Sequence, residues 1–152
     1  MSGKWDARYL KLAREVATWS KDRSTQVGAV IILEDNTPGP YGFNGFPRAV
    51  DDDADERHAR PLKYEWTEHA ERNAIFHAAR VGMRLSGSSI YVTHFPCSDC
   101  SRAIIQCGIR EIIVDSKSKD DPDFTERWGE IQTQEEMLKE ASVSWRFASV
   151  EE

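Results

Sequence analysis

One histidine and two cysteines have the residue types and spacing of a zinc site. They are His69 and the pair Cys97 and Cys100. Imidazole and thiolate groups suit zinc, and three protein ligands leave one of four coordination positions open for water. Glu71 follows two residues after His69, close enough to act on that water without binding the metal. The set therefore predicts a catalytic zinc site with Glu71 as its acid–base group.

A Cys-x-x-Cys pair alone has other interpretations, because it is also typical of redox pairs and of structural zinc knuckles. A redox pair needs no His-x-Glu, and a structural zinc site needs a fourth ligand. The one further thiol of the chain, Cys107, is expected on the same helix as Cys100. The combination H-x-E followed by P-C-x-x-C is the known signature of zinc-dependent nucleobase deaminases, and it is complete here.

The composition is that of one globular domain, and we expect a single domain over residues 1–152. No apolar run approaches the roughly 20 residues that cross a bilayer. The N-terminus lacks the apolar stretch of a secretory signal. Three cysteines, two of them assigned to a metal, suit a reducing compartment better than a disulfide scaffold. We therefore expect a cytoplasmic protein with no membrane partner.

The net charge of −6 bears on the kind of partner. A protein that follows a nucleic acid along its phosphates usually carries a basic stripe. This chain has none and ends in Glu151 and Glu152. A small substrate with one or a few phosphates needs only a local cluster of donors. The charge balance therefore favours a free nucleotide over a nucleic-acid polymer.

A first helix is indicated by apolar residues at three- and four-residue steps between charged ones. We expect it to end near Ser20 and to bury its apolar stripe in the core. The stripe consists of Trp5, Tyr9, Leu12, Val16 and Trp19.

The helix that carries the histidine is expected over residues 68–81. Thr67 is suited to its N-cap, and Gly82 to its end. His69 and Glu71 then lie in the first turn, where backbone N–H groups have no helical partner. Small or short side chains on one face would allow close packing on a sheet: Ala70, Ala74, Ala78 and Val81.

The remaining pattern alternates strands and helices. Pro96 is suited to the first position of a helix that carries both cysteines, whose dipole would favour thiolate. The Val- and Ile-rich run 26–33 is typical of a strand buried on both faces. Strands are expected at 26–33, 41–43, 89–95, 111–115 and 143–147, and helices at 5–20, 68–81, 96–108 and 124–141. This order predicts an α/β layered domain with a partly parallel sheet, the last two strands being parallel neighbours.

Two polar stretches are expected to be loops, at 49–66 and 116–123. The first is acidic over residues 51–56 and then basic. A loop of that length in a compact domain is usually functional or disordered. Two interpretations remain open for it, a solvated flap and a segment that closes over a substrate.

The chain resembles the cytidine deaminase superfamily, and within it the deoxycytidylate deaminases, over nearly its whole length to about Asp115. The zinc signature is common to the superfamily, whereas Ser20-Lys21-Asp22 and Gly42-Phe43-Asn44-Gly45 favour the deoxycytidylate deaminases. The other matching segments are Gln26-Val27-Gly28-Ala29, the run 69–75, the run 95–100 and the run 104–109. The resemblance implies a three-layer α/β/α fold with a five-stranded mixed sheet.

The resemblance also implies an activity, the hydrolysis of dCMP to dUMP and ammonia. His69, Cys97 and Cys100 would hold one catalytic Zn²⁺, which activates a water for attack on C4 of cytosine. Glu71 would move protons from that water to N3 and to the leaving ammonia. The substrate contacts that it implies are the Ala70 N–H for the pyrimidine carbonyl, Asn44 for a sugar hydroxyl, and some of Lys21, Arg23, Ser24 and Arg48 for the phosphate. Members of the family are usually oligomers, often hexamers, so a homo-oligomer is expected.

Three alternatives remain open from the residues. The enzyme could act on another free base or nucleotide. It could act on adenosine in tRNA, as relatives with the same metal pattern do, although the acidic net charge argues against this. It could also be a zinc module without catalysis, which would leave Glu71 without a role.

Overall fold

A mixed sheet of five strands lies at the centre of the computed structural model, which describes residues 3–121 and 131–151. The strands are β1 (Gly28–Ile32), β2 (Pro38–Phe43), β3 (Ser89–Val92), β4 (Glu111–Asp115) and β5 (Ser144–Ala148). Their order across the sheet is β2-β1-β3-β4-β5. β1 pairs antiparallel with β2 and β3, whereas β3, β4 and β5 run parallel. The predicted mixed sheet with parallel last strands is confirmed.

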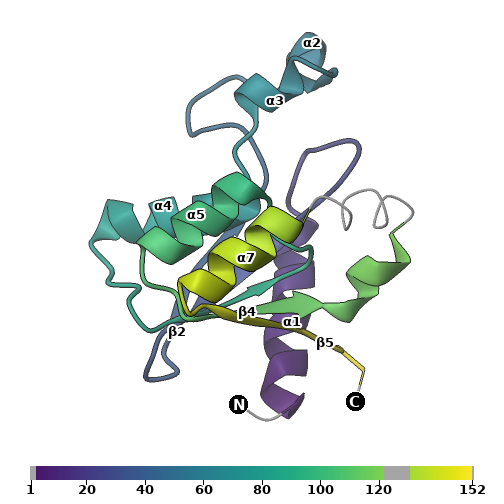
Figure 1. Cartoon of the computed structure of the whole chain (residues 1–152). Coiled ribbons are helices and arrows are strands. Elements are labelled where there is room, and N and C mark those ends of the chain that lie inside the picture. Colours follow the sequence, from purple (N-terminus) through teal and green to yellow (C-terminus); the bar gives the residue numbers. More distant parts are fainter. Residues whose placement is uncertain (1–2, 122–130, 152) are drawn as a thin grey trace.

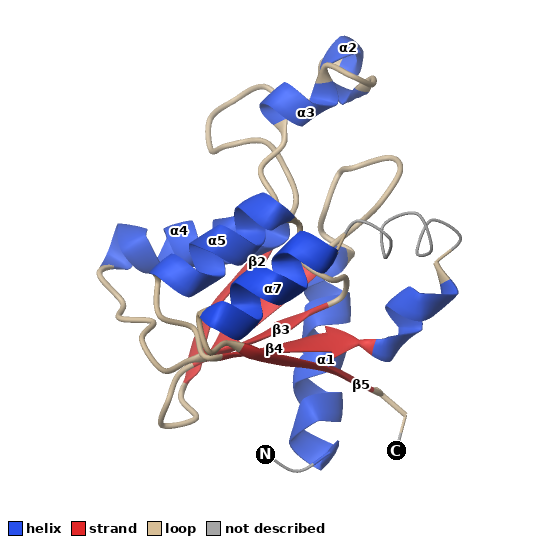
Figure 2. Ribbon diagram, viewed as in Figure 1, coloured by secondary structure: helices blue, strands red, loops and turns tan. Residues whose placement is uncertain are grey.

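Helices cover both faces of this sheet (Figure 2). α1 (Gly3–Ala17) lies on one face, and α4 (Ala70–Val81), α5 (Ser98–Gln106) and α7 (Gln132–Glu140) lie on the other. This is the predicted three-layer α/β/α arrangement. The helix expected at 124–141 is seen from Gln132 onward, and residues 124–130 fall outside the described part of the chain. Among the described residues, no helix is both long and apolar enough to cross a membrane.

The inner strand β1, which lies between β2 and β3, shows how the core is divided into two clusters. All of its residues are buried, and alternate side chains point to opposite faces. Ala29 and Ile31 pack in the cluster beneath α4, α5 and α7, whereas Val30 and Ile32 pack in the cluster beneath α1. The prediction of a strand buried on both faces is confirmed.

The apolar stripe predicted for the first helix was wrong in part. Val16 is buried, but Trp5, Leu12 and Trp19 are 43%, 46% and 46% exposed. The helix also ends at Ala17.

The reason is the close approach of α1 to the sheet at Gly28. A Cβ atom on Gly28 would lie 2.7 Å from the backbone nitrogen of Ala17. Only small side chains, such as those of Ala13 and Ala17, fit against the sheet at that separation. Leu12 therefore lies on the outer side of the helix, and Trp19 lies beyond its last residue, where its ring meets those of Tyr41 and Phe43 edge to face.

The stretch 49–66 contains two short helices, so the prediction of a plain loop was wrong. They are α2 (Asp55–His58) and α3 (Lys63–Trp66), and they project away from the sheet and its helices (Figure 1). The expected loop after β4 likewise begins with a 3₁₀ turn, η1 (Ser116–Asp120).

Candidate active site

The predicted metal ligands lie at the beginnings of two helices. His69 is the N-cap of α4, and Cys97 is the N-cap of α5. The helices predicted to begin at residue 68 and at Pro96 each begin two residues later. Both helices present N-terminal backbone N–H groups and the positive end of their dipoles to the site.

Close packing of α4 on β2 sets the position of this helix. A Cβ atom on Gly42 would lie 2.5 Å from the backbone nitrogen of Ala74. Ala70, Ala74 and Ala78 are buried against the sheet, as the small-residue face predicted. Val81, assigned to the same face, is 71% exposed, so that part of the prediction was wrong.

The segment just before α4 is held by hydrogen bonds to the end of β2. Glu68 and Gly45 exchange two backbone hydrogen bonds of 2.7 and 3.0 Å immediately before His69. The side-chain amide of Asn73 donates to the carbonyl oxygen of Phe43 at 2.8 Å. These contacts fix the direction in which His69 leaves the backbone.

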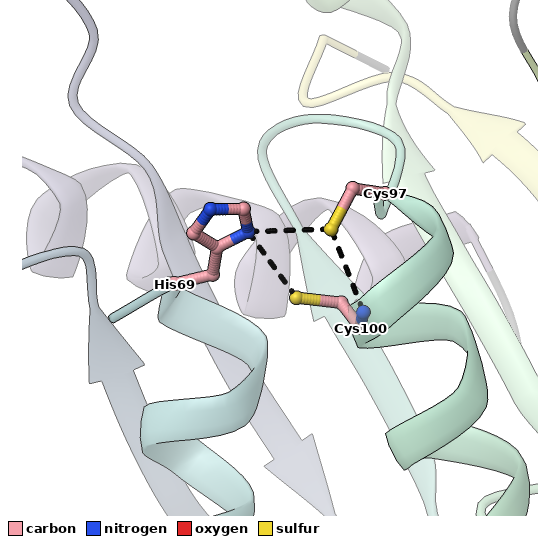
Figure 3. Close-up of side chains that lie close together, drawn as sticks. All are labelled: His69, Cys97 and Cys100. Carbon is pink, nitrogen blue, oxygen red and sulfur yellow. Dashed lines mark hydrogen bonds between the residues drawn. The ribbon is translucent and has the colours of Figure 1, made fainter. Parts of the chain in front are cut away.

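The three predicted ligands converge with the spacing of a zinc site (Figure 3). The Nδ1 atom of His69 lies 3.3 Å from the sulfur of Cys97 and 3.5 Å from that of Cys100. A tetrahedral zinc ion with ordinary bond lengths would separate its nitrogen and sulfur ligands by about 3.6 Å. Among the described residues, no fourth His, Cys, Asp or Glu side chain joins this group. The residues therefore fit a zinc ion with one coordination position left for water.

One of the two cysteines, Cys97, is favoured in its negatively charged thiolate form. The Cys100 thiol hydrogen-bonds to Cys97 and, together with His69, lowers the pKa of Cys97 well below its usual range, although burial opposes this. The same pairing raises the pKa of Cys100. Cys97 is thus held as the thiolate that metal binding requires, and its N-cap position favours the same charge.

Glu71 is buried beside these ligands, with 4% of its surface exposed. Burial, the largest influence, raises the pKa of its carboxyl group. A carboxyl group with a raised pKa holds a proton more readily near neutral pH than an exposed glutamate does. This suits a group that takes up a proton and returns it.

A cavity of about 490 Å³ opens in front of the ligands and has the size of a small-molecule site. Two residues predicted to contact a substrate, Asn44 and Ala70, line it. The four predicted phosphate contacts do not: Lys21, Arg23, Ser24 and Arg48. The lining residues to which the sequence analysis assigned no contact with substrate or metal are Asp22, Thr25, Val27, Arg60, Lys63, Tyr64, Thr67, His94, Phe95, Pro96, Ser118, Asp121, Ile131 and Gln134.

Asn44 also has a role in shaping the cavity. Its Oδ1 atom accepts from the Val27 N–H at 2.8 Å, and its Nδ2 atom donates to the Thr25 carbonyl at 2.9 Å. One amide hydrogen remains for a ligand.

Segment 49–66 is tied to residues 21–23 by opposite charges. Lys21 pairs with Asp52 at 2.8 Å, and Arg23 pairs with Asp55 at 2.6 Å. These carboxylates pair with two of the three cations that were predicted to bind phosphate. The alternating Lys-Asp-Arg sequence, set against an acidic run, was the signal that could have indicated this pairing.

Comparison with known proteins identifies the family. The model of the cytidine and deoxycytidylate deaminase zinc-binding region matches residues 3–116. The chain belongs to this family. The match confirms the resemblance inferred from the sequence, the predicted deaminase class and the predicted zinc dependence.

Individual relatives agree with this assignment. The deaminase is 46% identical over 144 residues to an uncharacterized deaminase of Aliivibrio fischeri, covering 94% of this chain and 92% of that one. It is 36% identical to the deoxycytidylate deaminase of Homo sapiens, covering 78% and 68%. The fold matches that of dCMP deaminase from the cyanophage S-TIM5 with a TM-score of 0.75, at 22% identity and with 97% and 98% coverage.

Proposed function

We propose that this deaminase hydrolyses dCMP to dUMP and ammonia. The observation that carries the proposal is a single cavity that contains both the acid–base group Glu71, beside the metal ligands, and the cations Arg60 and Lys63. A cytosine base and a phosphate can therefore be held together. The name of the human relative, deoxycytidylate deaminase, supports the same substrate.

The inner end of the cavity would receive the base. His69, Cys97 and Cys100 would hold a zinc ion there, which as a Lewis acid would lower the pKa of a water molecule enough for attack at neutral pH. Glu71 would take the proton from the attacking water, pass it to N3 of the ring and assist the departure of ammonia. The Ala70 N–H, at the first position of α4, is free of a helical partner and donates to the pyrimidine carbonyl.

The phosphate would lie against segment 49–66. Lys63 is buried and is neutralised by Asp22, whose Oδ2 atom lies 3.3 Å from its Nζ atom. Arg60 lines the same cavity and makes no ion pair with any described residue. Its guanidinium group can bind phosphate oxygens in a bidentate manner. We therefore assign the principal phosphate contact to Arg60 and a supporting one to Lys63.

This assignment favours the substrate-closure interpretation of segment 49–66. The segment carries Arg60, Lys63 and Tyr64 into the cavity wall, and its ion pairs with residues 21–23 hold it there. Asn44, at the other side of the sugar position, keeps an amide hydrogen for a hydroxyl group.

The test is ammonia release by the zinc-loaded protein from dCMP, CMP, dCTP, deoxycytidine and guanine. We expect dCMP to give the highest kcat/KM and deoxycytidine a much lower one, because the nucleoside cannot use Arg60. Equal turnover of dCMP and deoxycytidine would contradict the phosphate assignment. Turnover of guanine alone would contradict the proposed substrate. Binding of tRNA at physiological salt would instead favour a polynucleotide substrate.

A further inference from the structure

Gln134 of α7 is a polar residue on the buried face of the helix, where an apolar residue is the usual choice. It lies between Ile131 and Leu138 on the buried face of the helix, and Leu138 packs in the core. Gln134 is only 6% exposed, yet its Oε1 atom has no hydrogen-bond partner among the described residues. A buried polar atom without a partner costs free energy of folding, and such an atom in a native structure needs an explanation.

The cavity in front of the metal ligands explains why this oxygen has no partner within the protein. In the described part of the chain, Ser88 and Ser101 also have buried side-chain oxygens without partners, but neither lines the cavity, whereas Gln134 does. A ligand in the cavity can therefore give the Gln134 amide the partner that the protein does not. Gln134 also lies beyond residues 3–116, so the family's zinc-binding region does not include it.

The chemistry of the surrounding wall restricts what that partner can be. Ser118 and Asp121 line the cavity together with Gln134. The Ser118 hydroxyl already donates to the carbonyl of Asp115 at 2.8 Å, so it can only accept from a ligand. The Gln134 Oε1 atom and the Ser118 hydroxyl oxygen are thus both acceptors, and Asp121 adds a carboxylate whose Oδ2 atom lies 3.8 Å from the Nε2 atom of His94 in the same wall. This part of the wall favours a donor group of the ligand over a phosphate oxygen. The phosphate would then bind at Arg60 and Lys63, as proposed above.

We propose that Gln134 is a specificity-determining residue that accepts a hydrogen bond from a neutral donor of the bound nucleotide, a sugar hydroxyl or a base N–H. The inference rests on the proposed function, because it takes a cytosine nucleotide as the ligand. Gln134 acts by binding and does not enter the proton transfers.

The experiment compares Gln134→Met with Gln132→Met in the zinc-loaded protein. Methionine keeps the length of the side chain and removes its polar atoms. Gln132 is an exposed residue of the same helix, so its replacement is a matched control. We measure kcat/KM for dCMP, the dissociation constant of dUMP by calorimetry, and the midpoint of urea unfolding without ligand.

We expect Gln134→Met to lower kcat/KM and to weaken dUMP binding by about 10-fold, the effect of losing one buried hydrogen bond to a ligand. We expect its unfolding midpoint to equal or exceed that of the wild type, because an unpartnered polar group has been removed. Gln132→Met should change neither ligand measurement. Equal ligand affinities for the two variants would overturn the inference. A Gln134→Met protein that is less stable than the wild type would also overturn it, because the amide would then have a structural role.

A second substrate distinguishes the two sources of the donor. With 2′,3′-dideoxycytidine monophosphate, a sugar-hydroxyl partner predicts that wild type and Gln134→Met become equal. A base N–H partner predicts that the 10-fold difference persists. A wild-type protein that neither binds dUMP nor deaminates dCMP would refute the proposed function and the inference together. A wild-type protein that does both leaves only the role of Gln134 to be decided.

Discussion

Gly42 of β2 and Ala74 of α4 approach so closely that no side chain fits between them. A Cβ atom on Gly42 would lie 2.5 Å from the Ala74 nitrogen, a distance that real Cβ contacts do not reach. This contact sets the height of α4 above the sheet, and α4 carries the residues that face the metal. The position of the site therefore depends on a glycine that has no chemical role.

Gly42→Ala should destabilise the protein and disturb the metal site together. We expect a loss of about 1–3 kcal/mol, the usual cost of overpacking, because the added carbon meets backbone atoms that cannot rotate away. Urea unfolding measures the loss, and zinc content per chain measures the disturbance. Gly45→Ala is the control, since its Cβ would meet only the Phe43 ring at 3.9 Å. Equal stability of the two variants would contradict this account of the packing.

Cys100→Ser should abolish stoichiometric zinc binding, whereas Cys107→Ser should not. Cys100 belongs to the converging ligand group, while Cys107 follows the end of α5 and does not belong to it. Replacing a soft thiolate by a hydroxyl removes one of three protein ligands. Zinc is measured by elemental analysis after dialysis against a weak chelator. Retention of one zinc ion per chain by Cys100→Ser would exclude the proposed ligand set.

Glu71→Gln should retain zinc and lose most of the activity. The amide keeps the shape of the side chain but cannot carry a proton between water, ring and leaving group. General acid–base groups contribute about 10²–10⁴-fold to the rate, so kcat should fall within that range. Zinc content and the dissociation constant of dUMP are measured alongside kcat. A variant with near-normal kcat would remove Glu71 from the mechanism.

Arg60→Gln should raise KM for dCMP by about 10-fold with little change for deoxycytidine, because it removes one charge-assisted contact to phosphate. Lys21→Gln tests the residue that the sequence indicated. The Lys21 Nζ atom lies 2.8 Å from Asp52 and is not part of the cavity wall, so its replacement should affect KM much less. A larger increase in KM for Lys21→Gln than for Arg60→Gln would instead indicate that residues 21–24 bind the phosphate.

The metal ligands were predictable from sequence because each part of the site is local. His69 and Glu71 lie two residues apart, Cys97 and Cys100 lie three apart, and both pairs occur where helices begin. The strands were predictable for a similar reason, since β1 is apolar on both faces. The roles of the ligands and of Glu71 stay predictions until the variants are measured.

The other cavity residues depend on contacts between distant parts of the chain. Arg60 reaches the cavity only because segment 49–66 folds back onto residues 21–23, and neither stretch reveals this alone. Gln134 reaches it from α7, far along the sequence. The aromatic stripe of α1 had the periodicity of a helix, but its buried face was decided by the packing at Gly28. The periodicity of apolar residues identifies a helix, whereas the segment that the helix packs against decides which of its faces is buried.

Asp22→Asn should destabilise the protein at neutral pH and have a much smaller effect in acid. The side chains of Asp22 and Lys63 are 8% and 10% exposed, so the variant leaves a nearly buried ammonium group without its partner. We expect a loss of about 2 kcal/mol at pH 7, less than a fully buried pair would lose, because both groups keep some contact with water.

The pH dependence follows from the carboxyl group of Asp22. Burial raises its pKa, but hydrogen bonds from the Thr25 and Ser24 N–H groups and the charge of Lys63 outweigh burial, so the pKa is lowered in the folded state. A lowered pKa contributes stability above the unfolded value of about 3.9, and this contribution is lost as pH falls through the folded value. Urea unfolding at pH 7 and pH 3 should therefore show a difference between wild type and variant that shrinks in acid. Asp52→Asn, which breaks an exposed pair, should show little difference at either pH. A gap between wild type and Asp22→Asn that is the same at both pH values would mean that the charge of Asp22 does not stabilise the fold.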